Sequence, residues 1–368
     1  MGSTAQAAGG HDWMTVTTRP FARDFSQSRD RFLAAASRAG ARIMSIAHPL
    51  KGSAGENLAT DVARIGPDDA DHLVVLVTGV HGVEHYAGSA CVCDWLERGG
   101  AVSLPDGMAM VVIHAINPWG ASYCRRYTED NVDLARNFLD PSEPMPENPA
   151  YEVLHDDLMG LAAGEAAGVV SRLYEKLGER EAIESLMGGQ YRHPEGFSFG
   201  GHQPTWAHRT VKTILLDQAR AAKQVCIVEF HSGLGPWGEV IPVSMHQGAD
   251  LDRVKRYFGD NIIAPRAEKG SHSASGHTTD GYVQVLEDRT LTSIVVEFGT
   301  YPAVTSLPVL LEDHRVHANG LERTEAGRAV ALANLEMHCP QDSDWQELVL
   351  LRGAQIIDAA IRGLSQCN

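Results

Sequence analysis

Four apolar runs dominate the hydrophobic pattern of the chain. Each run is rich in β-branched residues, and segments with a helical pattern of polar and apolar positions separate them. Continuous apolar runs are typical of strands buried on both faces, and strands that alternate with helices indicate βαβ units. The pattern therefore predicts an α/β fold with a mixed, largely parallel twisted sheet flanked by helices. The four predicted strands are residues 73–80, 110–116, 225–230 and 293–298.

Weaker patterns predict the remaining elements. Residues 25–41 have the spacing of an amphipathic helix, and the alternating segments 43–47 and 57–65 indicate two strands. Three segments rich in proline and glycine are longer than ordinary connections, so we expect them to be functional loops. These loops are residues 139–149, 188–206 and 265–281.

The domain organisation follows from the absence of repeats and low-complexity linkers in the sequence. We expect residues 21–368 to form a single domain, with a helical insertion at about 150–187. Residues 1–20 are mostly small and polar and carry no basic region followed by an apolar core, so they predict a flexible tail rather than a secretory signal.

Polar residues stand at or directly after the ends of the four strong strands. His81 and Glu84 follow the first strand, Asn117 follows the second, His231 follows the third, and Glu297 lies in the fourth. Ligands of open α/β sheets bind outside the carboxyl ends of the strands. We therefore expect these side chains to converge on one site.

The segment His81-Gly82-Val83-Glu84-His85 contains two imidazoles and a carboxylate. It matches the pattern H-x-x-E-H, in which both histidines bind zinc from one helix and the glutamate is the base. The β-branched strand before it and Gly82 within it both disfavour a helix here. A helix beginning near Tyr86 would instead place His81 and Glu84 on a turn, as a ligand pair.

A ligand pair needs a third partner, because catalytic zinc usually has three protein ligands and an open position. His231 is the best candidate, since it follows an apolar strand and precedes several glycines. Glu297 then has two interpretations. A carboxylate at the end of a buried strand is either paired in a salt bridge or functional, here as a general base.

Net charge and cysteine content narrow the function classes. The formal charge is −16 and no stripe of Lys and Arg is present, which argues against nucleic acid and against anionic membrane surfaces as partners. No stretch approaches 18 uncharged apolar residues, so a membrane span is not predicted. The six cysteines are irregularly spaced, as expected of reduced thiols in a cytoplasmic protein. A small molecule or short peptide is the expected partner.

The ordered motifs resemble the zinc carboxypeptidase superfamily. That superfamily includes the carboxypeptidase A-like peptidases and the succinylglutamate desuccinylase/aspartoacylase deacylases. The resemblance rests on His81-x-x-Glu84, Asn117-Pro118, the segment NVDLARNF (131–138), His231 and Glu297, in this order. The segments GGQYRHPEGFSFGG (188–201) and HSGLGPWG (231–238) resemble a poorly characterised bacterial branch of it.

The resemblance implies a role for each matching residue. It makes His81, Glu84 and His231 the ligands of one Zn²⁺ per chain, and Glu297 the base that takes a proton from zinc-activated water. Arg126 would polarise the scissile carbonyl, with Arg125 as the alternative. Substrate binding is implied for Arg136, Asn117 and Tyr282, the last as a mobile tyrosine in the loop before the Glu297 strand.

One position departs from the family pattern. The family has Asn-Arg where this chain has Ala135-Arg136, so a donor to the substrate's terminal carboxylate is lost. A hydrogen bond to a charged group contributes roughly 1.5–3 kcal/mol. The difference bears on specificity rather than on the reaction type.

Three functions remain open at this point. The first is a zinc-dependent hydrolase of an amide bond in a small, anionic peptide or N-acyl amino acid. The second is an esterase or deacylase on the same scaffold, acting on substrates without a free α-carboxylate. The third is a zinc-binding scaffold protein without catalysis, which the presence of Glu297 disfavours.

Overall fold

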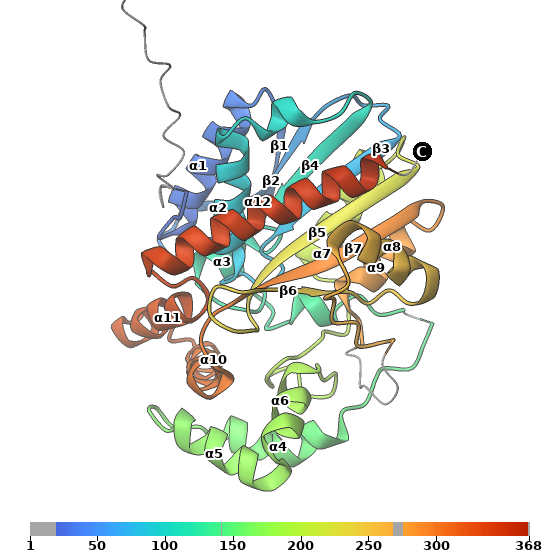
Figure 1. The fold of residues 1–368 in the computed structure, drawn as a ribbon. Helices are drawn as coiled ribbons and strands as arrows, with labels where there is room; N and C mark the ends of the chain where they lie inside the picture. Colours follow the sequence, from blue (N-terminus) through green and yellow to red (C-terminus); the bar gives the residue numbers. More distant parts are fainter. Residues whose placement is uncertain (1–19, 141, 268–274, 367–368) are drawn as a thin grey trace, which may run out of the picture.

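The computed structural model describes residues 20–140, 142–267 and 275–366. Within these residues, seven strands form one sheet in the order β1-β2-β4-β3-β5-β7-β6 (Figure 1). The four strands in the middle are mutually parallel. The predicted α/β fold with a mixed, largely parallel sheet is confirmed. The parallel strands are β4 (Met108–His114), β3 (His72–Thr78), β5 (Gln224–Gly233) and β7 (Thr290–Gly299).

Antiparallel strands border the parallel centre on both sides. β1 (Arg42–Lys51) pairs with β2 (Asn57–Ile65), which pairs in turn with β4, and both β1 and β2 include the predicted strands. On the opposite edge β6 (Val240–Val243) pairs with β7. The hydrophobic pattern did not predict β6, because the strand is only four residues long and contains Pro242. Proline within a sheet is confined to edge strands, where its missing N–H costs no ladder bond.

Helices cover both faces of the sheet (Figure 1). One apolar layer joins the sheet to a group of helices that includes the long α12, which runs across the face of the sheet. A second layer joins the opposite face to α7 and α9. The helices of the first group are α1 (Phe25–Arg38), α2 (His85–Glu97), α8 (Gly248–Phe258), α11 (Glu325–His338) and α12 (Ser343–Ser365), and those of the second are α7 (Trp206–Gln218) and α9 (Thr278–Val285).

The alternation of side chains along β5 determines where the polar residues point. Cys226, Val228 and Phe230 belong to the first layer, whereas Val225 and Ile227 belong to the second. Successive side chains of a strand point to opposite faces. Odd-numbered residues near the carboxyl end of β5 therefore face the side of the sheet that α7 and α9 cover.

Three further helices lie between α3 and α7 in the sequence, within the segment predicted to be a helical insertion. They bury their own apolar cluster, which includes Leu154 and Leu173 and is closed by Leu307 and Leu311 of α10. The assignment of one domain stays a prediction, and the predicted tail lies outside the described residues except for Pro20. The helices are α4 (Pro149–Met159), α5 (Ala166–Leu177) and α6 (Glu179–Met187), and α10 spans Ala303–Ala318.

Short helices and the ends of longer ones complete the fold. The predicted helix over 25–41 ends earlier, at Arg38, and is followed by Gly40 with a φ of 73°. None of the described helices is both long and apolar enough to cross a bilayer.

The five cysteines in the described residues are buried free thiols. The short helices are η1 (Gly100–Ser103), α3 (Pro118–Ser122) and η2 (Leu134–Arg136).

A buried ion pair ties the segment after α3 to α10. The Arg125 Nε donates to Asp313 Oδ2 at 3.0 Å, and both side chains are buried. Within the described residues the two terminal nitrogens of Arg125 have no hydrogen-bond partner, so Asp313 is the partner of this charge. The guanidinium also lies 5.9 Å from the ring centroids of Trp119 and Tyr127. Arg125 therefore acts in packing the scaffold.

Replacing Asp313 should be strongly destabilising for this reason. Asp313→Ala leaves the Arg125 charge buried without a partner, and breaking a buried pair in this way costs about 3–5 kcal/mol. Urea denaturation would measure the change in the free energy of unfolding. The matched control is Glu97→Ala, which breaks the exposed Arg38–Glu97 pair and should cost no more than about 1 kcal/mol. Equal losses in the two variants would contradict the structural role of Arg125.

Candidate metal centre

The turn between β3 and α2 is shaped by close backbone contacts. A Cβ on Gly82 would lie 2.1 Å from the carbonyl carbon of Gly120, so no side chain fits there. The N–H groups of Gly82 and Val83 donate to the carbonyl oxygens of Arg126 and Arg125, at 3.1 and 2.8 Å. The segment that follows α3 therefore holds the turn in place. α2 begins at His85, with Glu84 as its N-cap residue, in agreement with a turn rather than a helix through His81.

Three buried side chains converge from this turn and from β5. His81 Nδ1 lies 2.9 Å from Glu84 Oε1, and His231 Nδ1 lies 2.8 Å from Glu84 Oε2. The two Nδ1 atoms are 3.0 Å apart. Two nitrogens bound ~2.0–2.1 Å from a tetrahedral zinc ion would be ~3.3 Å apart, close to the observed spacing.

Each of the two imidazoles is oriented by a second carboxylate on its other nitrogen. His81 Nε2 lies 3.1 Å from Asp133 Oδ1, and His231 Nε2 lies 2.7 Å from Glu229 Oε1. When both Nε2 atoms donate to these carboxylates, both Nδ1 lone pairs face each other and the Glu84 carboxylate. Burial opposes protonation of His231, but its hydrogen bonds to Glu229 and Glu84 raise its pKa well above the ordinary value. A proton or a metal cation among these electron-pair donors therefore relieves their repulsion. The donor set is His₂Glu, which fits Zn²⁺.

The electrostatics of the group keep its carboxylates ionised. Burial opposes ionisation of Glu84, but His81 and His231 outweigh burial and lower its pKa well below the ordinary value. Burial also opposes ionisation of Glu229, yet the hydrogen bond from His231 brings its pKa down to about 2. The pKa of Asp133 is lowered despite burial, chiefly by Arg126 and then by His81. Three anions thus surround the two imidazoles.

Arg126 lies between two of these anions. Its Nη1 donates to Glu84 Oε1 at 2.8 Å, and its Nε is 3.5 Å from Asp133 Oδ2. The sequence left Arg125 and Arg126 as alternatives for the site, and the contacts separate them. Arg126 faces the metal-ligand candidates, whereas Arg125 points to Asp313 on α10.

Glu297 lies beside His231 without a partner of its own. The two residues are paired in register on the parallel strands β5 and β7, so their side chains share one face of the sheet. Within the described residues the Glu297 carboxylate, which is only partly buried, makes no hydrogen bond or ion pair. Burial and the nearby charge of Glu84 raise its pKa. The salt-bridge interpretation of Glu297 therefore finds no partner here, and a carboxylate with raised proton affinity stands next to the histidines.

His85 belongs to a separate network. Its Nε2 lies 2.9 Å from Ser28 Oγ and its Nδ1 lies 3.0 Å from Thr78 Oγ1, so both ring nitrogens are engaged away from Glu84. The ring also packs edge-on against His114. The two histidines of the H-x-x-E-H pattern therefore do not act as a ligand pair on one helix in this protein, because the second histidine, His85, points into the contact between α1 and α2.

Tyr282 requires a correction. The sequence placed it in a mobile loop, but it lies in α9 and is buried. Its hydroxyl donates to Glu229 Oε2 at 2.5 Å, and Thr278 Oγ1 of the same helix donates to Glu229 Oε1 at 3.0 Å. The helix begins inside the segment that was expected to be a loop. Tyr282 thus holds the carboxylate that orients His231.

The other predicted substrate residues have structural contacts of their own. The Arg136 Nε and Nη2 donate to the carbonyl oxygen of Met187 at 3.1 and 2.7 Å, and its Nη1 donates to Ala135 O. Asn117 caps α3 by accepting from the N–H of Gly120 at 2.9 Å. Neither residue forms a hydrogen bond or ion pair with the group around Glu84, so their roles toward a substrate stay predictions.

Sequence reasoning did not single out Asp133 and Glu229. Glu229 stands two positions before His231 in a strand, a spacing that places both on one face, and this signal was present in the sequence. Asp133 lies in the NVDLARNF segment, but nothing in that segment reveals that it meets His81, 52 positions earlier. The contact depends on the path of the chain.

The chain belongs to the family of proteins of unknown function DUF2817, whose model matches residues 21–352. No curated protein matches it in sequence. A solved carboxypeptidase A from Helicoverpa armigera is 12% identical over 86% of this chain and 75% of its own, with a TM-score of 0.49. The succinylglutamate desuccinylase from Chromobacterium violaceum is 14% identical over 85% of this chain and 74% of its own, with a TM-score of 0.38.

The contact between Glu229 and His231 leads to a prediction about metal affinity. Glu229→Gln preserves size but removes the charge that fixes the ring of His231, and loss of such an outer partner typically weakens metal binding by ~10–100-fold. Competition with a chromogenic chelator would measure the Kd for zinc. Glu239→Gln, an exposed carboxylate beyond the end of β5, is the control and should leave the Kd unchanged. An unchanged Kd in Glu229→Gln would remove Glu229 from this role.

Proposed function

We propose that this protein is a zinc-dependent hydrolase that cleaves an amide bond in a small peptide or N-acyl amino acid. The observation that carries the proposal is the meeting of His81, Glu84 and His231 around one point, with the unpaired carboxylate of Glu297 beside it. A set of ligands alone would suit a binding protein. A free carboxylate of raised pKa next to the ligands supports catalysis.

Each residue has a defined task in this reaction. His81, Glu84 and His231 would hold the zinc ion, which as a Lewis acid polarises a carbonyl oxygen and lowers the pKa of water. Glu297 accepts the proton of the attacking water and later returns it to the leaving amine. Arg126 places guanidinium N–H groups beside Glu84, where they would stabilise negative charge on the substrate oxygen. Asp133 and Glu229 keep the two imidazoles in orientation.

The charge of the substrate is inferred from the two arginines. Arg126 and Arg136 are two cations in the motif segments of a protein of net charge −16, and cations of this kind would attract an anionic substrate. Ala135 provides no side-chain donor in the same segment. The guanidinium of Arg136 already donates to Met187 O and Ala135 O.

These two observations favour a second candidate, an esterase or deacylase. Its substrate would lack a free α-carboxylate and so would not need a dedicated receptor near Ala135. The scaffold and the zinc ligands would be the same in both cases. The candidates differ in the bond that is cleaved and in the group that lies beside Arg136.

A substrate panel tests the proposal. Dipeptides, N-acyl amino acids and small esters would be incubated with the purified protein, each carboxylate compound being paired with its neutral amide. We expect hydrolysis of at least one amide class, loss of activity with a chelator, and recovery on addition of zinc. Activity on esters alone would favour the second candidate, and no metal-dependent hydrolysis of any member would contradict both.

Glu297→Gln separates catalysis from structure. The variant preserves the size of the side chain and the three zinc ligands, so zinc content and Tm should stay near those of the wild type. General-base catalysis contributes ~10²–10⁴-fold to rate, and kcat should fall by about this factor with KM little changed. Atomic absorption, thermal unfolding and steady-state kinetics on one preparation would measure all three. Retained activity would exclude Glu297 as the base.

A further inference from the structure

A second group of histidines and carboxylates lies far from β3 in the chain, on α4 and on the loop after α6. Glu152 and His155 are three positions apart on α4, a spacing that places both on one side of the helix. His193 and Glu195 come from the loop. The side chains are accessible, with exposed fractions of 13% for His155, 23% for His193 and 56% for Glu195.

As in the first centre, each imidazole of this group has one nitrogen near an outer polar group and the other nitrogen near a shared carboxylate. His193 Nε2 is held by the Glu152 carboxylate at 3.1 Å, and His155 Nδ1 lies 3.5 Å from Tyr151 Oη. The remaining nitrogens lie near one carboxylate oxygen, since His155 Nε2 and His193 Nδ1 are 3.7 and 3.8 Å from Glu195 Oε1. The ligand atoms of the three residues lie within 4.8 Å of one another.

We propose that His155, His193 and Glu195 form a second divalent-cation site, suited to zinc. The donor set is again His₂Glu, which matches a borderline ion such as Zn²⁺, and Glu152 is the outer carboxylate that orients His193. The spacing between two ligand atoms on a tetrahedral zinc ion is ~3.3 Å, so Glu195 needs to approach by less than 1 Å. Within the described residues the Glu195 carboxylate makes no hydrogen bond that would prevent this.

Binding requires one change in the rings. His155 and His193 are stacked with their centroids 3.6 Å apart and their planes inclined by 20°. Lone pairs of imidazole nitrogens lie in the ring plane, so two stacked rings cannot both point at one ion. His155 is the ring free to turn, because its 3.5 Å contact with Tyr151 is long, whereas Glu152 holds His193.

The proposed second site is connected to the segment that supports the first centre. The carbonyl oxygens on both sides of Glu195, those of Pro194 and Gly196, accept hydrogen bonds from the Asn131 side chain, each at 3.0 Å. Asn131 stands two residues before Asp133, the carboxylate that orients His81. An ion at Glu195 would therefore fasten α4 to the loop that supports this segment.

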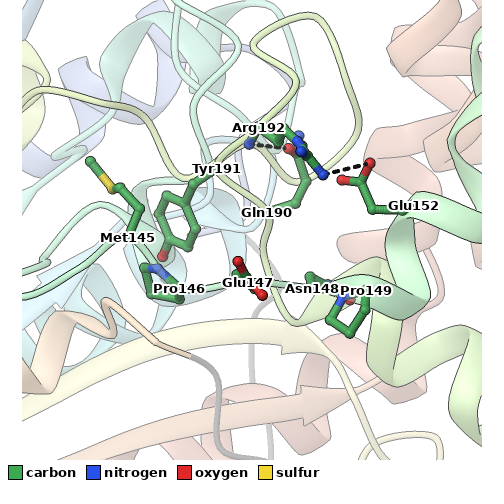
Figure 2. Close-up of a pocket in the computed structure, with 9 residues that line it drawn as sticks. All are labelled: Met145, Pro146, Glu147, Asn148, Pro149, Glu152, Gln190, Tyr191 and Arg192. Atoms are coloured by element: carbon green, nitrogen blue, oxygen red, sulfur yellow. Dashed lines mark hydrogen bonds and ion pairs between the residues drawn. The ribbon is translucent and has the colours of Figure 1, made fainter.

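A hollow in the surface adjoins the outer carboxylate of this group, Glu152. The hollow has a volume of about 310 Å³ and is lined also by Asn148, Gln190, Tyr191 and Arg192. Figure 2 shows these side chains. Arg192 Nη1 lies 3.6 Å from Glu152 Oε2 and is largely exposed. Of the residues assigned to the second site, Glu152 is the one that lines this hollow.

Zinc stoichiometry of the chelator-stripped, full-length protein tests the proposal. We expect two equivalents in the wild type, one in His231→Ala, one in His193→Ala and none in the double variant. His72→Ala, which removes a histidine at the start of β3, is the control and should retain two. Adding zinc should raise the Tm of His231→Ala but not that of the double variant.

Glu195→Gln provides a second test that does not endanger folding, because the residue is exposed. In the His231→Ala background it should weaken zinc binding by more than the ~10–100-fold expected for an outer partner. A single equivalent in the wild type that is lost in His231→Ala would overturn the second site and leave the first intact. A single equivalent lost only in His193→Ala would overturn the first site instead.

Discussion

The central constraint on this structure is the repulsion among three electron-pair donors, the Nδ1 atoms of His81 and His231 and the carboxylate of Glu84. Two imidazole nitrogens and a carboxylate approach within 2.8–3.0 Å of one another. They are kept there by contacts on their far sides, since Asp133 and Glu229 engage the Nε2 atoms and Arg126 engages Glu84. α9 in turn fixes Glu229 through Tyr282 and Thr278. The outer contacts thus force the inner groups together, and a proton on His231 or a metal cation between the groups relieves the resulting repulsion.

Sheet topology explains why these residues meet. His81 and His231 are 150 positions apart, yet β3 and β5 are parallel neighbours whose carboxyl ends lie at one edge. Glu297 reaches the same edge because β7 pairs in register with β5. The connection between β3 and α2 positions His81 and Glu84, since Gly82 allows this turn to pack directly against the backbone of Gly120. Parallel pairing therefore brings the site residues to one edge of the sheet, and the turn at Gly82 orients His81 and Glu84.

Much of this arrangement could be predicted from the sequence. Long apolar strands are recognisable from their continuous hydrophobic runs, and residues at the carboxyl ends of such strands share one edge of the sheet. For this reason His81, Glu84, His231 and Glu297 were identified together. Contacts that depend on the course of a loop were not predictable. Tyr282 was assigned to a loop because no periodicity reveals an eight-residue helix among glycines and histidines. The partners of Arg125, Arg126 and Asp133 likewise depend on how the segment after α3 folds back, and β6 was too short to recognise.

The register of β5 against its neighbours has a consequence for how the protein folds. Glu229 and His231 lie on one face of a strand with a side-chain period of two, so a slip of one residue would turn both toward α2 and α12. The ligands also come from strands far apart in sequence, and such pairings form late because long loops must first close. The unfolded chain therefore offers no preformed cation site. An ion that binds only the correctly registered sheet would favour that register over its neighbours, so metal supply would act as a proofreading step in folding.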